Sequence, residues 1–192
     1  AHRAADAWLR HCPAHRAVLE RRFHGEWRRV DALASIATGL ARRGHGELAH
    51  ELLRRVSLDV ETCSDDEFLQ PGARAGALAR LGCAYGEVFR TTGDPTARSL
   101  ARDQLMEAAD AASTVKGAVF GHESCATLVT AWIEALRLDL REAAGLEQRA
   151  QQSARELAHH SNFGSSWDGL RDLARARLGL DKREVALAVL AE

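Results

Sequence analysis

The chain has 192 residues, with 26 basic and 27 acidic side chains, a formal charge of -1 and 46% hydrophobic residues. This length can bury a core without disulfide bonds, and the balanced charge argues against a strongly basic surface for nucleic acid or membranes. The sequence contains no apolar run long enough to span a membrane, and its N-terminus lacks the apolar core of a signal peptide. We therefore expect a cytoplasmic protein.

The composition favours an all-α fold. Proline and aromatic residues are scarce, whereas Ala, Leu, Arg and Glu dominate. Glycine and proline residues divide the chain into expected helices, which cover residues 2–11, 14–24, 27–43, 47–61, 73–91, 95–112, 123–142, 146–160, 166–178 and 182–191. Short connections predict antiparallel hairpins. We expect an N-terminal helical pair over residues 1–26 and one continuous helical array over 27–192.

Apolar and small residues recur at matching positions in successive hairpins. In the first hairpin a small residue, Ala37, follows Leu33 and Ile36, and Ala49 and Leu53 lie on the second helix. The other copies place their large and small residues at Leu78, Leu81, Gly82, Tyr85, Ala101, Leu105 and Ala108, at Trp132, Leu136, Ala150, Ala154 and Leu157, and at Leu170, Leu173, Ala174, Ala186 and Leu190. The small residues are expected to let the paired helices approach closely.

This spacing resembles the tetratricopeptide repeat, in a degenerate form with a longer period. The resemblance covers about residues 27 to 191 and implies a right-handed α-solenoid of antiparallel hairpins. Such arrays occur in the sensor regions of bacterial signalling proteins and transcription regulators. The resemblance therefore implies a scaffold for protein–protein interaction or sensing rather than an enzyme.

The context of the chain is inferred from its composition and its ends. Of the 26 basic residues, 24 are arginine, which is typical of a GC-rich bacterial coding bias. The first residue is not Met, and the apolar pattern REVALAVLAE ends without a stop signal, so we expect a fragment of a larger bacterial regulator. A solenoid without polar end caps could also form a homodimer.

A metal-dependent helical-bundle enzyme is the alternative interpretation. The tetrapeptide ELAH occurs twice and supplies two Glu-x-x-His pairs, Glu47 with His50 and Glu156 with His159. Residues three apart share a helical face and can bind one ion, as in di-iron carboxylate bundles. However, Glu47 and His159 fall in terminal turns, where they suit the helix dipole, so the repeat explains both tetrapeptides. We assign no catalytic residue, no metal and no cofactor.

Arginine residues recur beside the packing positions of the first helices. In the repeat register, these positions point into the concave groove of a solenoid. The predicted groove residues are Thr38, Arg42, Arg80, Arg137, Arg141, Arg171 and Arg175, with Asp31, Cys83, Glu87 and Glu134 among them. Guanidinium groups suit carboxylates and peptide carbonyls, so the expected partner is a protein or peptide segment with acidic character. The alternative is that these arginines pair with neighbouring Asp and Glu side chains on a solvated face.

Overall fold

A computed structural model describes residues 26–62, 72–115, 118–159, 173 and 175 of the chain. These residues form helices and no strand, which confirms the all-α prediction for the part of the chain described. The helices are α3 (Glu26–Arg42), α4 (Gly46–Thr62), α5 (Ala73–Thr92), α6 (Pro95–Thr114), α7 (Ala118–Arg137) and α8 (Ala143–His159). The expected N-terminal pair over residues 1–26 and the expected helices 166–178 and 182–191 lie almost entirely outside the described residues.

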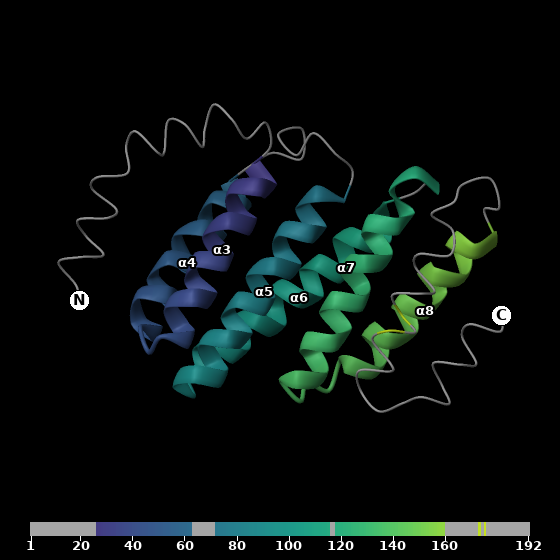
Figure 1. Ribbon diagram of the computed structural model, residues 1–192. Helices are drawn as coiled ribbons and strands as arrows, with labels where there is room; N and C mark the ends of the chain where they lie inside the picture. Colours follow the sequence, from purple (N-terminus) through teal and green to yellow (C-terminus); the bar gives the residue numbers. More distant parts are fainter. Residues whose placement is uncertain (1–25, 63–71, 116–117, 160–172, 174, 176–192) are drawn as a thin grey trace.

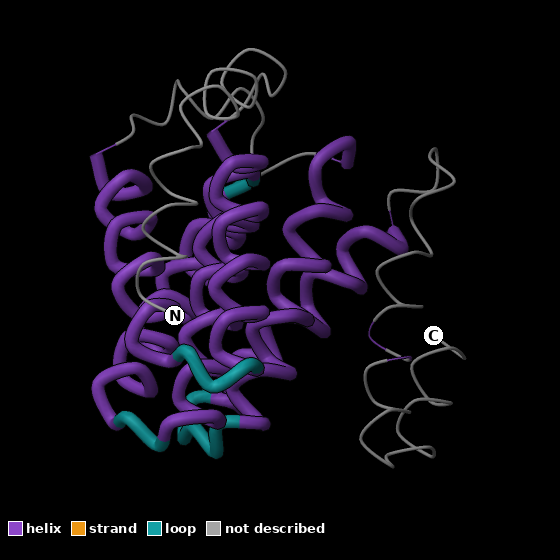
Figure 2. The backbone as a smooth tube through the Cα atoms, turned by 60° about the vertical axis from the view of Figure 1, so that its left-hand side comes forward, coloured by secondary structure: helices purple, strands orange, loops and turns teal. Residues whose placement is uncertain are grey.

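The helices are arranged as three successive hairpins, α3 with α4, α5 with α6, and α7 with α8. Figures 1 and 2 show them side by side in a row, with α3 and α4 at one end and α8 at the other. The first helices of the hairpins pack on one another, α3 on α5 and α5 on α7. Side chains on α3, α5 and α7 can therefore form a surface that crosses all three hairpins.

The core is continuous from α3 to α8. Its largest fully buried side chains include Trp132, Tyr85, Leu53, Leu105 and Leu146, which come from five different helices. Each hairpin alone would leave one apolar face uncovered, and stacking the hairpins removes that surface from water. Most packing positions of the repeat register are buried, whereas Leu33, Ile36 and Leu136 are only partly buried. The buried positions are Ala37, Ala49, Leu53, Leu78, Leu81, Gly82, Tyr85, Ala101, Leu105, Ala108, Trp132, Ala150, Ala154, Leu157 and Leu173.

Gly82 lies at the close approach between α5 and α6. A Cβ atom at this position would be 2.7 Å from Cδ2 and Cγ of Leu105 and 3.2 Å from the backbone oxygen of Ala101. These distances are well inside the carbon–carbon contact distance of roughly 3.5–4.0 Å. The absence of a side chain at Gly82 therefore sets the spacing of this hairpin, as the sequence predicts.

Helix α7 begins and ends earlier than expected. The sequence predicts a helix over 123–142, because Gly117 and Gly121 favour a break before it, whereas α7 spans Ala118–Arg137 and contains Gly121. Asp139, two residues after the end of α7, has a left-handed φ of 50°. The amide of Leu140 donates to the carbonyl of Ala135 (2.9 Å), as in a Schellman cap. Arg98 of α6 supports this end by donating to the carbonyls of Leu138 and Asp139 at 2.8–3.1 Å.

Helix α8 begins before the glycine that was expected to precede it. The sequence predicts a helix over 146–160 that follows Gly145, but the helix spans Ala143–His159 with Gly145 in its first turn. Glycine is tolerated in a first turn at little cost, since fewer backbone hydrogen bonds depend on it there.

Candidate binding surface

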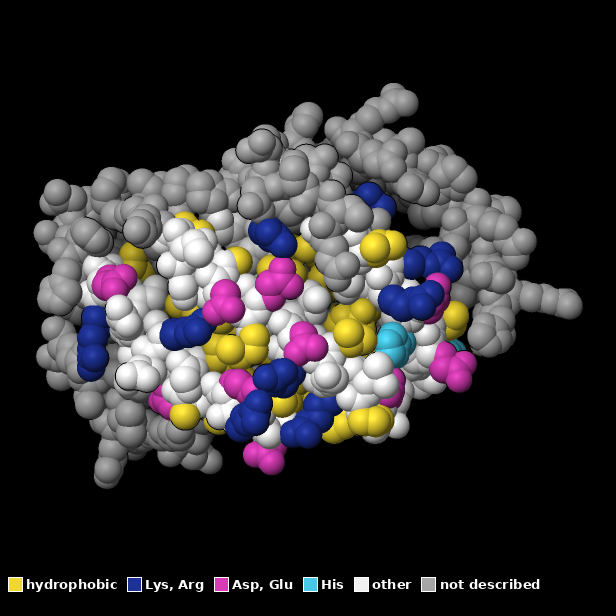
Figure 3. All heavy atoms as spheres, turned by 180° about the vertical axis from the view of Figure 1, so that it is seen from behind, with side chains coloured by type: hydrophobic (Ala, Val, Ile, Leu, Met, Phe, Trp, Pro, Cys, Tyr) yellow, Lys and Arg dark blue, Asp and Glu magenta, His cyan; other side chains and the backbone are white. Residues whose placement is uncertain are grey.

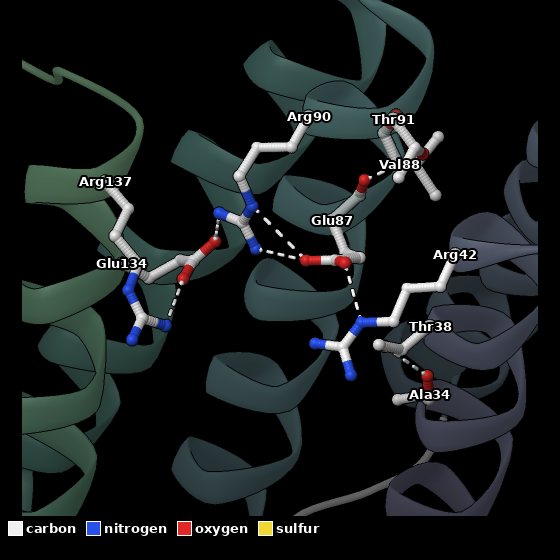
Figure 4. A network of polar contacts seen from close by, with 9 residues as sticks. All are labelled: Ala34, Thr38, Arg42, Glu87, Val88, Arg90, Thr91, Glu134 and Arg137. Atoms are coloured by element: carbon white, nitrogen blue, oxygen red, sulfur yellow. Dashed lines mark hydrogen bonds and ion pairs between the residues drawn. The ribbon is translucent and has the colours of Figure 1, made fainter.

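Five charged side chains form a continuous row across the first helices, which we call the charged row: Arg42, Glu87, Arg90, Glu134 and Arg137. Figure 4 shows them alternating in sign from α3 through α5 to α7. Arg42 Nε donates to Glu87 Oε1 at 2.7 Å, and Arg90 donates to Glu87 Oε2 at 2.7 and 3.2 Å. Arg90 also donates to Glu134 Oε1, and Arg137 lies 3.5 Å from Glu134 Oε2. The row therefore links all three hairpins.

The carboxylates of the charged row are recessed, whereas two of its guanidinium groups are exposed. The side chains of Glu87 and Glu134 are 13% and 2% exposed, against 66% for Arg42 and 61% for Arg137. Arg90 lies between these limits, at 32%. Because the negative charges lie beneath the positive ones, a molecule that approaches this surface meets cations first.

Gly86 makes room for the buried carboxylate. A Cβ atom on Gly86 would overlap Glu134 Oε1 and would lie 3.2 Å from its Cδ and 3.3 Å from Leu138 Cδ1. A buried carboxylate is costly unless cations and hydrogen bonds compensate it, and here Arg90 and Arg137 supply both. The missing side chain at Gly86 lets Glu134 reach those arginines between α5 and α7.

The contacts of Glu87 and Arg90 hold both groups in their charged forms. Burial acts to raise the pKa of Glu87, but hydrogen bonds from Arg42 and Arg90 outweigh it, so the pKa is lowered from 4.5. Burial acts to lower the pKa of Arg90, but hydrogen bonds to Glu87 and Glu134 outweigh it and raise the pKa above the ordinary value of an arginine. The centre of the row is thus charged at neutral pH.

A second ion pair lies further toward the start of α5. Arg80 Nε lies 3.1 Å from Asp31 Oδ1, which joins α5 to α3. Cys83, three residues along α5, is half-buried, and burial raises the pKa of its thiol to about 12. A thiol with this pKa remains protonated at neutral pH and is a poor nucleophile.

The predicted groove residues have mixed outcomes. Arg42, Arg80 and Arg137 are exposed, and each contacts an acidic side chain. Thr38 hydrogen-bonds to the carbonyl of Ala34 in its own helix (2.9 Å). The expectation that Arg141 lies on a first helix is wrong, because α7 has already ended at that point. Arg141 sits in the following turn and contacts Glu142 (3.1 Å).

The last two predicted groove residues, Arg171 and Arg175, lie in or beside the part of the chain that the structure does not describe. Arg171 lies outside the described residues, and Arg175 is exposed.

The repeat register does not single out Arg90 or Gly86 as residues of this surface. A local signal for Arg90 exists, because Glu-x-x-Arg occurs in EVFR (87–90) and again in EALR (134–137), on the two neighbouring first helices. Residues three apart lie on one helical face, so the motif places an acid and a base together on each helix. The role of Gly86 depends on the approach of α7, which has no local sequence signal.

The two ELAH segments lie on helices at opposite ends of the array (Figure 1). Glu47 and His50 are on α4, whereas Glu156 and His159 are on α8. His50 Nδ1 lies 3.2 Å from Asp94 Oδ2, and its ring packs edge-on against Tyr85 at 5.8 Å between centroids. Glu156 accepts a hydrogen bond from Gln152. The fold thus does not bring the two pairs to one ion, and no group of three or more potential ligands occurs among the described residues.

The face opposite to the view of Figure 1 carries charges of both signs. Figure 3 shows basic and acidic side chains interspersed over this face, with apolar side chains between them. Ion pairs on the second helices are consistent with this pattern, including Arg55 with Glu51 at 2.9 Å and Arg149 with Asp110 at 2.6 Å. None of the described helices combines the length and apolar character that crossing a bilayer requires.

Comparisons of the chain with protein-family models, with curated proteins and with solved structures found no match. The geometry of the charged row and the packing of the hairpins are therefore the observations from which a function can be inferred.

Proposed function

We propose that the chain is a protein-interaction or sensing scaffold and part of a larger bacterial regulator. It folds as a right-handed α-solenoid of tetratricopeptide-like hairpins. Its partner is a peptide or protein segment that binds the shared face of α3, α5 and α7, which is the concave side of the solenoid. The observation that carries this proposal is the charged row, because it places exposed guanidinium groups on a surface built by three hairpins together.

Equivalent contacts between successive hairpins support the repeat. His50 follows the buried Ala49 on α4 and contacts Asp94, the N-cap of α6. Arg102 follows the buried Ala101 on α6 and contacts Glu142, the residue before α8, at 2.7 Å. In both cases a basic residue one position after the small residue meets an acidic residue at the start of the next second helix. The same contact at matching positions is expected of stacked copies.

The turns within the hairpins give further support. Gly44, with a φ of 81°, ends α3, and the amide of His45 donates to the carbonyl of Leu40 at 3.0 Å. Asp139 ends α7 with the same handedness and the equivalent hydrogen bond from Leu140 to Ala135. The first and third hairpins therefore share one capping motif, although Asp replaces Gly in the third.

A selection of displayed random peptides on the 192-residue chain tests the proposed function. Ser35 is exposed on α3, one turn from Asp31 and two turns from Arg42, so Ser35→Trp adds bulk to the shared face without changing its charge. The matched control is Gln152→Trp at an exposed position on α8. We expect selected peptides to lose affinity for Ser35→Trp and to keep it for Gln152→Trp. Equal binding to both variants would refute a site on this face.

A further inference from the structure

We infer that the partner presents an extended acidic segment with two carboxylates about five or six residues apart, one bound by Arg42 and the other by Arg137. This inference rests on the proposed function and specifies the chemistry of its partner. It also gives the residues of the charged row different roles. Arg42 and Arg137 contact the partner, whereas Arg90, Glu87 and Glu134 position them.

The hydrogen bonds of each arginine distinguish these roles. Arg90 directs all three of its nitrogens inward, with Nε and one terminal nitrogen on Glu87 and the other terminal nitrogen on Glu134. Toward the residues that the structure describes, Arg42 donates through Nε alone, and Arg137 donates through one terminal nitrogen at a long 3.5 Å. A guanidinium group presents its N–H donors on three nitrogens. Two nitrogens of Arg42 and two of Arg137 remain available for a carboxylate from outside, whereas each nitrogen of Arg90 already donates to a glutamate.

The recessed glutamates orient the two exposed arginines. A long side chain loses conformational freedom when it binds a ligand, and this loss weakens the interaction. The contact between Glu87 and Arg42 restricts that freedom before binding, and Glu134 does the same for Arg137. Three cations and two anions also leave the row with one net positive charge, and its most exposed side chains, Arg42 and Arg137, are both cationic. An anionic segment is therefore favoured over a cationic one.

The spacing of the two carboxylates follows from helix packing. Arg42 is on α3 and Arg137 is on α7, with α5 between them. Packed helices lie roughly 8–10 Å apart, so two spacings separate the arginines by roughly 16–20 Å. An extended chain advances about 3.3 Å per residue and covers this distance in about five or six residues. A helical segment would need about twice as many ordered residues, at a larger cost in conformational entropy.

The experiment uses a peptide selected from a random twelve-residue library on the 192-residue chain, labelled and titrated by fluorescence polarisation. We expect the selected sequences to share two acidic residues at the stated separation. Arg42→Glu should weaken binding at least roughly tenfold, and so should Arg137→Glu. Arg42→Gln and Arg137→Gln remove the charges without introducing repulsion, and they should weaken binding less. The matched control is Arg55→Glu on α4, where the side chain is 67% exposed and paired at 2.9 Å.

Charge exchange assigns each carboxylate to its arginine. Replacing one acidic residue of the peptide with Lys should restore binding to Arg42→Glu, and replacing the other should restore binding to Arg137→Glu. Each Lys peptide should bind the unaltered chain at least roughly tenfold more weakly than the acidic peptide does. Selected peptides that lack the acidic pair, or that respond equally to Arg55→Glu, would overturn the inference. If such peptides still lost affinity for Ser35→Trp, the proposed function would stand and only the acidic partner would be rejected.

Discussion

Substitution of Gly86 tests whether the contact between α5 and α7 depends on the buried Glu134. An alanine Cβ at position 86 would overlap Glu134 Oε1, and the carboxylate is 2% exposed, so it cannot move into solvent freely. Displacing it weakens its ion pair with Arg90. Breaking a buried pair costs about 3–5 kcal/mol, whereas glycine to alanine in a helix gains about 1 kcal/mol. Since the carboxylate can shift partway, we expect a net loss of about 1–3 kcal/mol for Gly86→Ala.

Gly76 provides a matched control in the same helix. A Cβ atom at Gly76 would meet nothing within 4 Å, so Gly76→Ala should gain up to about 1 kcal/mol from helix propensity alone. The assay is urea unfolding of both variants, monitored by circular dichroism at a wavelength that reports helix content. If Gly86→Ala were as stabilising as Gly76→Ala, the reasoning about the buried carboxylate would be refuted.

Three further predictions concern single residues. Asp139 adopts a left-handed φ of 50°, so Asp139→Gly should stabilise the chain by about 0.5–1 kcal/mol in the same unfolding assay, and a loss of stability would contradict this. Because the pKa of Glu87 is lowered in the folded state, its ionised carboxylate stabilises the fold above about pH 4.5, and this stability is lost as the pH falls through the folded-state pKa. Glu87→Gln lacks this carboxylate, so on acidification from about pH 5 to 3 the variant should lose less stability than the unaltered chain. A parallel pH dependence of the two proteins would show that Glu87 is not responsible. The pKa of Cys83, about 12, predicts slow alkylation by iodoacetamide at pH 8, measured by mass spectrometry of its peptide, and a rate equal to that of an unfolded cysteine peptide would contradict it.

The sequence predicts much of the helical architecture because its signals are local. The start of α6 follows from Asp94 and Pro95, and the Asp94 side chain indeed accepts a hydrogen bond from the amide of Thr96 at 2.9 Å. The close approach at Gly82 follows from its register with Ala37. Errors occur where a local signal has two meanings. Gly121 is typical of a helix break, yet it lies inside α7, since a glycine within a helix costs only about 1 kcal/mol.

The candidate surface is only partly predictable, because its contacts cross helices that are distant in sequence. The register places Arg42 and Arg137 on first helices, and the structure brings both into the charged row. The register does not reveal that the Glu134 side chain is buried or that Gly86 leaves space for it, since both depend on how α7 approaches α5. The sequence equally allows the arginines of this face to pair with neighbouring acids, and Arg42, Arg90 and Arg137 are indeed paired with glutamates.

The most direct test of the central claim is to locate the bound partner segment by nuclear magnetic resonance. A selected acidic peptide would be added to isotope-labelled chain while the Nε–Hε signals of the arginines are followed. The charged row predicts the largest changes at Arg42 and Arg137, with smaller changes at Arg90 and little change at Arg55 on α4. Changes concentrated on α4, α6 and α8, with the signals of Arg42 and Arg137 unmoved, would contradict a binding surface on the first helices.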